Sequence, residues 1–396
     1  MFPKSRLSFS NFVDQRKTKL ALILVAISPD IGGLLIKGEK GSGKSSLVRS
    51  FANLLPKIEY VEDCQYHCNP NDLTHMCKQC RRKLRSGKIN TAKKKMEVVN
   101  LPLGATEDAV VGTVNIEKTL KEKKKEFQPG ILAKANRNIL YIDEVNLLPD
   151  HLTDTILDAA ARGWNHVERE GISVEHPANF ILIGTMPPEE GELRPQLLDR
   201  FGLCVNMNFV REVGKRKEII EKNIQPISKA ERRDQERDEK IKKRITTARK
   251  LLPHVEALPS ILKLIAITCQ ELEVNGHRPD IVATLTAKAV TAFDGRRIVS
   301  PRDVSIGLHF SLSHRTRESG ELAPPSSEEI EETLKRALER LKDTIEEERR
   351  QLEKKREMLR GEDKRLGLPV TREKPITKPG PRGMTKDNNR HHLLFF

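Results

Sequence analysis

Residues 38 to 46 have the composition of a loop that binds phosphate groups. Gly38, Gly43, Lys44 and Ser45 fit the spacing G-x-x-x-x-G-K-[ST]. In such a loop the backbone N–H groups surround the phosphates, the lysine reaches the β- and γ-phosphates, and the hydroxyl ligates Mg²⁺. The sequence therefore predicts an ATP-binding loop made of Gly38, Glu39, Lys40, Gly41, Ser42, Gly43, Lys44, Ser45 and Ser46.

The residues on both sides of this loop have the pattern that the motif requires. An apolar run, Leu34 to Ile36, precedes it and predicts a strand. Apolar residues at helical spacing follow it, at Leu47, Val48, Phe51 and Leu54. A strand before the loop and a helix after it favour nucleotide binding over a purely structural turn.

A second apolar run, "NILYIDEVNLL", contains two adjacent carboxylates, Asp143 and Glu144. Open α/β sheets bind their ligands at the carboxyl ends of strands, so these carboxylates are expected near the phosphates. We expect Asp143 to hold Mg²⁺ through water and Glu144 to orient or deprotonate the attacking water. The phosphate loop and this strand together predict an ATPase.

Two arginines, Arg194 and Arg200, follow a third apolar run over residues 179–185. An arginine in this place can reach the γ-phosphate of a neighbouring subunit's ATP and stabilise charge in the transition state. The alternative is an ion pair within the chain. Both interpretations stay open at this point, and the candidate partners for such an ion pair are Glu190, Glu192 and Asp199.

Four cysteines lie within residues 64–80, "CQYHCNPNDLTHMCKQC". Their spacing, C-x3-C-x8-C-x2-C, suits a structural zinc site formed by Cys64, Cys68, Cys77 and Cys80, with His67 and His75 as spare ligands. A structural disulfide is disfavoured in a reducing cytosol. Zinc is the leading interpretation, and a redox-active dithiol, unliganded thiols and an iron–sulfur cluster stay as alternatives.

Composition places the chain among charged α/β proteins with much exposed helix. It has 396 residues, of which 37% are hydrophobic and 32% charged, and its formal net charge is +15. The basic runs lack interleaved aromatic residues, so we do not expect nucleic acid as a partner. The longest apolar stretch, residues 20–36, is interrupted by Ser28, Pro29 and Asp30, and no secretory signal is visible, so we expect a cytoplasmic protein without a membrane segment.

Several longer stretches resemble one family. "GEKGSGKS", "NLPLGATEDAVVGT", "PGILAKANRNILYIDEVNLL", "VEREGISVEHPANFILIGTM" and "PEEGELRPQLLDRFG" are similar to the ATPase (I) subunit of magnesium chelatase, an AAA+ protein. The resemblance is dense from Phe12 to Arg317. It implies an αβα P-loop domain followed by a small helical lid, assembled as a ring that is expected to be a hexamer, with ATP at each subunit junction.

The resemblance also implies roles for individual residues. Lys44 and Ser45 match the Walker A pair, and Asp143 and Glu144 match the Walker B pair. Arg200 matches the arginine finger that acts on the neighbour's ATP. In "NGHRPDIVATLTAKAVTAF", Arg278 matches the lid arginine called sensor 2, which couples the γ-phosphate to the position of the lid. An ion pair of Arg278 with Asp280 is the alternative.

One position departs from the family pattern. The family usually has "TMNPEEG", in which the asparagine, called sensor 1, helps to polarise the attacking water. In this chain Met186 is followed by Pro187. Because proline has neither a side-chain donor nor a backbone N–H, that role is lost or has passed to another residue such as Thr185.

The sequence divides into five parts. We expect the P-loop domain over residues 1–207, with the four-cysteine insertion at 64–80 and a hairpin with its turn at Gly171. A charged helical connector is expected over 208–250 and the lid over 251–317. A charged helix over 326–360 begins with a capping box and carries one apolar stripe, which suits docking on a partner better than a long coiled coil. Residues 361–396 are expected to be disordered.

The resemblance finally implies partners. A D-like subunit would carry the von Willebrand type A domain, whose metal motif we do not find here, and a large subunit would bind the tetrapyrrole and insert the metal. The cysteine-bound metal would not be the one inserted. Two other functions stay open: a MoxR-like AAA+ remodeller that works with a von Willebrand type A partner, and a nucleic-acid motor favoured only by charge.

Overall fold

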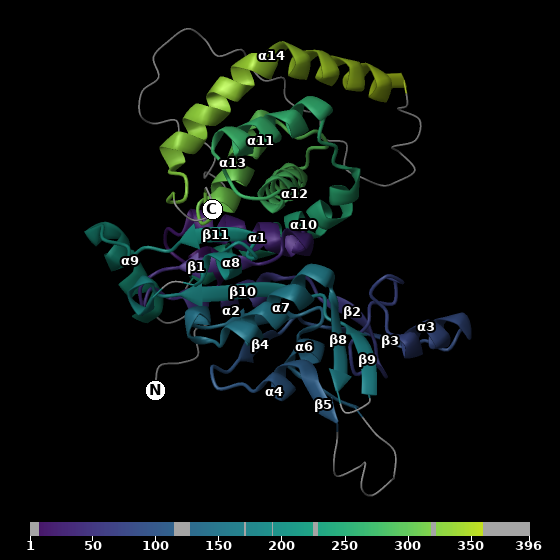
Figure 1. Ribbon diagram of the computed structural model, residues 1–396. Coiled ribbons are helices and arrows are strands. Elements are labelled where there is room, and N and C mark those ends of the chain that lie inside the picture. The colour runs from purple at the N-terminus through teal and green to yellow at the C-terminus, as the bar shows by residue number, and fades with distance from the viewer. Residues whose placement is uncertain are drawn as a thin grey trace, which may run out of the picture.

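The computed structural model describes residues 8–114, 127–169, 172–191, 193–224, 229–317 and 322–358. Figure 1 shows a lower α/β domain, which carries the phosphate loop, and an upper helical domain. Helix α1 (Arg16–Ile27) lies between them and is buried along most of its length. No helix in the described ranges combines the length and apolarity needed to span a bilayer.

The lower domain is built on a five-stranded parallel sheet in the order β11-β1-β10-β7-β4. Its strands are apolar on both faces, as expected for a parallel sheet covered on both sides. The expected α/β class is therefore confirmed. The strands are β1 (Leu34–Lys37), β4 (Val98–Leu101), β7 (Ile139–Ile142), β10 (Ile181–Met186) and β11 (Leu203–Asn206).

Helices cover the two faces of this sheet and give separate hydrophobic cores. Alternate strand residues point to opposite faces, so Leu34 and Ile36 join the core that continues into the lid, whereas Leu35 lies in the other core. The helices of this domain, besides α1, are α2 (Lys44–Leu54), α4 (Glu107–Val111), α6 (Ile131–Ala135), α7 (Asp150–Arg162) and α8 (Pro195–Leu198). Short 3₁₀ turns lie at η1 (Phe9–Asn11), η2 (Pro29–Ile31), η3 (Val145–Leu147), η4 (Pro188–Glu190) and η5 (Leu252–His254).

Three two-stranded ribbons extend from the domain. One, β2 (Ile58–Val61) with β3 (Thr91–Lys94), carries the cysteine segment and its helix α3 (Lys78–Arg85). The second pairs β5 (Gly112–Val114) with β6 (Phe127–Pro129). The third is the expected hairpin, β8 (Trp164–Arg169) with β9 (Ile172–Pro177), which is confirmed although its turn at Gly171 lies outside the described residues.

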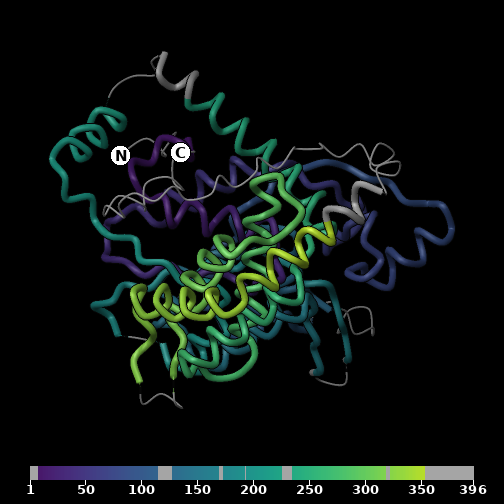
Figure 2. Tube along the Cα trace, turned by 90° about the horizontal axis from the view of Figure 1, so that it is seen from above, coloured from purple at the N-terminus to yellow at the C-terminus, as the bar shows by residue number. Residues whose placement is uncertain are grey.

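The upper domain contains α10 (Lys229–Leu251), α11 (Pro259–Glu271), α12 (Arg278–Phe293) and α13 (Pro301–Leu312). Helix α9 (Val213–Ile224) projects from the body of the protein (Figure 2). Ile241, Ile245 and Ala248 of α10 are buried in the lid core. The second half of the stretch expected as an exposed connector is therefore packed, because these three residues recur at helical spacing on one face.

Helix α14 (Ser327–Met358) arches over α11 and α13 (Figures 1 and 2). Its expected capping box is present, because Ser326 N donates to Glu329 (2.7 Å) and Glu329 N donates to Ser326 Oγ (3.1 Å). The apolar stripe contacts this chain's own lid, through Ile330, Leu334, Ala337, Leu341 and Ile345. The expected stop at Gly361 and the tail 361–396 lie outside the described residues.

The apolar stripe of α14 is interrupted at Glu348 for a structural reason. The Glu348 carboxylate accepts hydrogen bonds from Ser260 N (3.1 Å) and Ser260 Oγ (2.6 Å). Ser260 is in the first turn of α11, where N–H groups lack intrahelical partners and negative charge is favoured. Glu348 thus caps α11 from the neighbouring helix.

Candidate functional site

The phosphate loop connects the end of β1 to the start of α2, as its sequence predicted. A Cβ atom on Gly38 would lie 2.4 Å from the Met207 carbonyl oxygen, so the loop passes β11 at a distance that only glycine allows. Gly41 and Gly43 have φ values of 81° and 88°. These left-handed conformations turn the backbone toward the helix N-terminus, where N–H groups are available to an anion.

Lys44 is nearly buried and its ammonium lies within the loop. It donates to the carbonyl oxygens of Gly38 (2.5 Å) and Glu39 (2.9 Å). Burial lowers the pKa of Lys44, while the nearby carboxylate of Asp143 acts in the opposite direction. A lysine held in this way presents its charge at the place where such loops bind the β- and γ-phosphates.

Asp143 follows β7 directly and is fixed by two neighbouring hydroxyl groups. Its Oδ1 accepts from Thr185 Oγ1 (2.6 Å) and from Tyr141 Oη (2.9 Å). The Tyr141 hydroxyl also interacts with Ser45, and burial raises the pKa of Tyr141 above its ordinary value. The Ser45 hydroxyl and the Asp143 carboxylate therefore converge on one place, and both are oxygen ligands of the kind that Mg²⁺ prefers.

Glu144 lies beside Asp143 in a left-handed conformation, with φ 56° and ψ 55°. Its backbone N–H donates to Thr185 Oγ1 (3.2 Å). Its carboxylate faces Lys40 of the loop (Nζ–Oε1 3.5 Å), and Lys40 also pairs with Glu190. Thr185 therefore contacts both Asp143 and Glu144. It lies in β10, which ends directly before Pro187, the residue that replaces the family asparagine.

Sequence reasoning missed Tyr141 and the contacts that Lys40 makes with the turn after β10. Tyr141 is two residues before Asp143, and the two-residue period of a strand places both on one face, so the signal was present. The contacts of Lys40 with Glu190 and of its backbone N–H with Glu189 (3.3 Å) join the loop to the turn after β10. No local sequence pattern predicts these contacts, because they depend on β1 and β10 being neighbours in the sheet.

The two arginines after β10 both form ion pairs within the chain, although not with the carboxylates considered from the sequence. Arg194 pairs with Asp150 (2.8 Å). Arg200 pairs with Asp154 (3.1 Å) and Asp158 (2.6 Å) of α7. These pairs are solvent-exposed, so they contribute little to stability and can exchange for another anion.

Arg278 does not pair with Asp280 in the structure. Its Nη2 donates to the backbone carbonyl of Arg200 (2.6 Å), and burial lowers its pKa, with a further contribution from the Arg200 charge. Two more lid residues hold the same segment. His314 Nε2 bonds to the Phe201 carbonyl (3.0 Å), and Arg315 donates to the carbonyls of Phe201 (2.8 Å) and Asp199.

The expected site residues thus form two groups. Lys40, Lys44, Asp143 and Glu144 meet at the carboxyl ends of the strands. Arg278 lies against Gly32, before the start of β1, with its Nη2 3.1 Å from the position of a Cβ on that glycine. Because β1 has four residues at about 3.3 Å each, the second group lies roughly 13 Å away along the sheet. Arg200 and Arg278 are therefore beside each other but not beside their own phosphate loop.

The four cysteines form one buried cluster. Their Sγ atoms all lie within 4.8 Å of one another. Backbone N–H groups point to the sulfurs, from Cys77 to Cys68 Sγ (3.2 Å) and from Tyr66 to Cys64 Sγ (3.4 Å). Such N–H groups stabilise negative charge on sulfur, so the donor set suits a cation that prefers thiolates.

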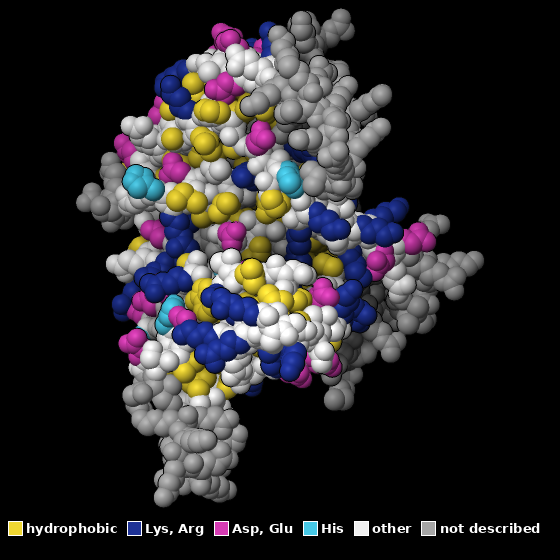
Figure 3. All heavy atoms as spheres, turned by 90° about the vertical axis from the view of Figure 1, so that its right-hand side faces the viewer, with side chains coloured by type: hydrophobic (Ala, Val, Ile, Leu, Met, Phe, Trp, Pro, Cys, Tyr) yellow, Lys and Arg dark blue, Asp and Glu magenta, His cyan; other side chains and the backbone are white. Residues whose placement is uncertain are grey.

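The cysteine segment packs against the root of the β8–β9 hairpin. The Tyr66 ring stacks on His176 with centroids 4.8 Å apart, and Lys78 pairs with Glu175 (3.2 Å). On the face from which this segment projects, Figure 3 shows many Lys and Arg side chains. The cluster is away from the phosphate loop and forms a separate structural feature.

Comparison with known proteins identifies the family. The model for magnesium chelatase subunit ChlI matches residues 8–198, and that for the AAA lid domain matches residues 262–336. A magnesium-chelatase subunit ChlI homolog of Methanocaldococcus jannaschii is 50% identical over 332 residues, which cover 82% of this chain and 90% of that protein. This chain belongs to the magnesium chelatase ChlI family. It is accordingly an AAA+ ATPase.

Other ChlI proteins and solved structures are also similar. The magnesium-chelatase subunit ChlI of Synechocystis is 46% identical, over 83% of this chain and 93% of that one. A solved protein of Cytophaga hutchinsonii, 16% identical, matches the fold with a TM-score of 0.51 over 83% of this chain and 90% of that chain. A chain in a structure of the BchI and BchD complex of magnesium chelatase is 40% identical over 83% of this chain and 99% of that chain, with a TM-score of 0.48.

The contacts of Thr185 predict an effect on turnover. Replacing Thr185 by valine keeps the shape of the side chain but removes the hydroxyl that bonds to Asp143 and to Glu144 N–H. Hydrogen bonds to charged groups contribute about 1.5–3 kcal/mol, so kcat for ATP hydrolysis should fall about ten- to hundredfold. Steady-state ATPase and nucleotide-binding measurements check this, with Thr185→Ser as the control that keeps the hydroxyl. An unchanged kcat in the valine variant would contradict it.

His314 predicts a pH dependence of stability. Burial lowers its pKa from 6.5 to about 3 in the folded protein, so between these values the unfolded chain binds the extra proton. Stability attributed to this group is therefore lost as the pH falls below 6.5, by about 2 kcal/mol at pH 5.

His314→Gln keeps a donor for the Phe201 carbonyl but does not titrate. Chemical denaturation at pH 7 and pH 5 should show a smaller acid-induced loss for this variant than for the wild type. The exposed His151→Gln is the control and should behave like the wild type. Equal pH dependence in all three proteins would show that His314 is not responsible.

Proposed function

We propose that this protein is the ATPase motor subunit of a metal chelatase. In this proposal, ATP hydrolysis drives metal insertion into a tetrapyrrole that partner subunits carry out. The observation that carries it is the joint placement of Lys44, Asp143 and Glu144 at the strand ends, in a chain of the ChlI family. Magnesium- and cobalt-type chelatases are both compatible with this ATPase chemistry.

The residues of the site suit in-line attack of water on ATP. We propose that the loop from Gly38 to Ser46 binds the phosphates through its N–H groups and Lys44, and that Ser45 and Asp143 hold Mg²⁺. Mg²⁺ held by these two residues would neutralise charge on the phosphates. Glu144 orients or deprotonates the water, and its contact with Lys40 must loosen as the phosphates attract that lysine. Thr185 keeps the Asp143 carboxylate and the Glu144 backbone in position.

We propose that Arg200 and Arg278 act on the ATP of a neighbouring subunit. Their distance from their own phosphate loop supports this. Both arginines lie near the start of β1, whereas the phosphate loop follows the end of β1, so they are too far away to reach the ATP bound by their own subunit. The exposed ion pairs of Arg200 with α7 are weak enough to exchange for a γ-phosphate. A closed ring, expected as a hexamer, supplies such a neighbour to every subunit.

The proposed partners follow from family membership. A D-like subunit with a von Willebrand type A domain would contact the ring, and a large subunit would bind the tetrapyrrole. The β8–β9 hairpin extends from the sheet domain and is therefore well placed to contact such a partner subunit. The cytoplasmic location stays a prediction, in keeping with an ATP substrate and six cysteines without a disulfide among them.

Reconstitution tests this function. With a D-like and a large subunit, the protein should increase metal insertion into the tetrapyrrole only when ATP is present. Glu144→Gln should retain nucleotide binding, lower ATP hydrolysis by at least about a hundredfold and abolish the stimulation. The exposed Glu339→Gln of α14 is a matched control and should match the wild type. If the wild type increases metal insertion into none of the tetrapyrroles tested, the chelatase proposal is wrong, whereas the assignment as an ATPase is unaffected.

We also propose that Cys64, Cys68, Cys77 and Cys80 bind a structural Zn²⁺ ion. The buried cluster, the N–H groups aimed at its sulfurs and the low apolar content of the segment support this. The ion would hold the segment against Tyr66 and the hairpin. It would not be the metal that the complex inserts, because the cluster is closed within the fold.

Metal analysis tests the zinc proposal. The purified wild type should contain about one Zn²⁺ per chain, and the Cys77→Ser, Cys80→Ser double variant should lose it together with several degrees of Tm. Replacing Cys204, which is buried outside the cluster, by serine is the control for loss of a thiol, and it should keep the metal. Unchanged metal content and Tm in the double variant would rule the site out.

A further inference from the structure

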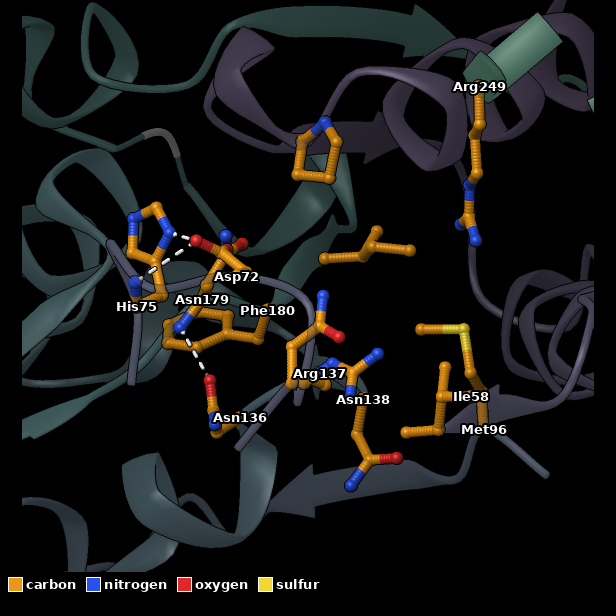
Figure 4. Close-up of a pocket in the computed structure, with 13 residues that line it drawn as sticks. Ile58, Asp72, His75, Met96, Asn136, Arg137, Asn138, Asn179, Phe180 and Arg249 are labelled. Carbon is orange, nitrogen blue, oxygen red and sulfur yellow. Dashed lines mark hydrogen bonds and ion pairs between the residues drawn. The ribbon is translucent and has the colours of Figure 1, made fainter. Parts of the chain in front are cut away.

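A cavity of about 160 Å³ lies between the cysteine segment, the sheet and the lid, away from the phosphate loop (Figure 4). It borders the starts of β7 and β10, so it is at the opposite edge of the sheet from the ATP site. Its walls combine several polar groups with an apolar surface. The lining residues used below are Asn69, Asp72, Arg137, Asn179 and Arg249, with Ile58, Met96 and Ile181 on the apolar side.

Arg249 enters this cavity from helix α10 of the lid. Its Nε donates to the Ala26 carbonyl (2.8 Å), and within the described residues its guanidinium has no acidic partner. Burial lowers the pKa of Arg249 to about 10, and the charge of Arg137 adds to this effect. A partly buried cation without a counter-charge is costly, so an anion beside it would be stabilising.

Arg137 lies on the other side of the same cavity, two residues before the start of β7. Its backbone is held in a left-handed conformation (φ 62°) by a hydrogen bond from its N–H to the Asn179 carbonyl (2.7 Å). Its Nη1 donates to the Glu59 carbonyl. The remaining guanidinium N–H groups have no hydrogen bond within the described residues, so Arg137 brings further donors to the cavity wall.

The other polar groups of the lining add to this excess of hydrogen-bond donors over acceptors. The side-chain NH₂ groups of Asn69 and Asn179 make no hydrogen bond within the described part of the chain. Asp72 is the acid in the lining, and its oxygens already accept from the His75 ring (3.0 Å) and from the backbone N–H groups of Thr74 (2.9 Å) and His75 (3.3 Å). The cavity is therefore lined by N–H donors that have no partner within the described residues, while the Asp72 carboxylate already accepts hydrogen bonds.

We infer that this cavity binds a small oxyanion of phosphate size between Arg137 and Arg249. Guanidinium groups pair with phosphate or carboxylate oxygens through two parallel N–H donors, and two such groups facing each other can hold one anion. A cavity of about 150 Å³ accommodates a molecule the size of benzene, so a tetrahedral oxyanion fits and a nucleotide does not.

Such an anion would link three parts of the protein. Arg249 belongs to the lid, Arg137 to the edge of the sheet, and Asn69 to the loop between Cys68 and Cys77. Because the anion contacts all three, its binding favours the arrangement in which they are close together. This is a site for an effector that stabilises the lid against the sheet domain, separate from ATP hydrolysis.

Titration with inorganic phosphate at constant ionic strength tests the site. The experiment uses the full chain with Lys44→Ala, which removes phosphate binding at the loop. Saturable binding should remain in this protein by isothermal titration calorimetry, and adding Arg249→Met should weaken it at least tenfold. Lys250→Met, which removes the adjacent exposed charge of the same helix, is the matched control and should leave the affinity unchanged.

Two further arms make the result decisive. Arg137→Met should weaken binding as Arg249→Met does, which covers the case in which one of the variants fails to fold. Acetate in place of phosphate distinguishes a carboxylate ligand from a phosphate ligand, and binding of either that requires both arginines supports the site. If neither anion binds saturably to the Lys44→Ala protein, or if Lys250→Met weakens binding as much as Arg249→Met, the inference is wrong.

Discussion

The arrangement of this protein depends on one set of contacts, in which the lid holds the backbone of residues 199–201. Arg278, His314 and Arg315 bond to carbonyl oxygens of this short segment, which lies between α8 and β11. Carbonyl groups that are buried at a domain junction need donors, and a guanidinium supplies several at fixed geometry. The position of the lid is thereby tied to the backbone that carries Arg200.

This constraint explains how nucleotide chemistry can move a neighbouring subunit. In the proposed ring, Arg200 follows the γ-phosphate of one subunit while its backbone stays bonded to the lid of its own. A change at the phosphate would then displace the segment and the lid together, because both are held by the same hydrogen bonds. The proposed anion cavity is at another part of the lid junction, and its lining includes Arg249 and Arg137.

Much of the site was predictable from local sequence. The phosphate loop needs glycines and a lysine at fixed spacing, and Asp143 and Glu144 follow an apolar strand, so short segments carry the signal. The αβα fold with its lid followed from the resemblance. Contacts between segments that are far apart in the sequence could not be predicted from it. Examples are the pairs Arg200 with Asp158, Glu348 with Ser260, and Lys40 with Glu190. These contacts depend on strand order and helix packing, which no single segment encodes.

The most direct test of the account asks whether one ATP site is built from two subunits. Arg200→Ala and Lys44→Ala proteins, each expected to be nearly inactive alone, would be mixed and their ATPase activity measured across mixing ratios. If Arg200 acts on the neighbour, some junctions in mixed rings pair an intact phosphate loop with an intact arginine, and activity should return with a maximum at intermediate ratios. Activity that stays at the level of the separate variants at every ratio, in rings shown to exchange subunits, would contradict the account.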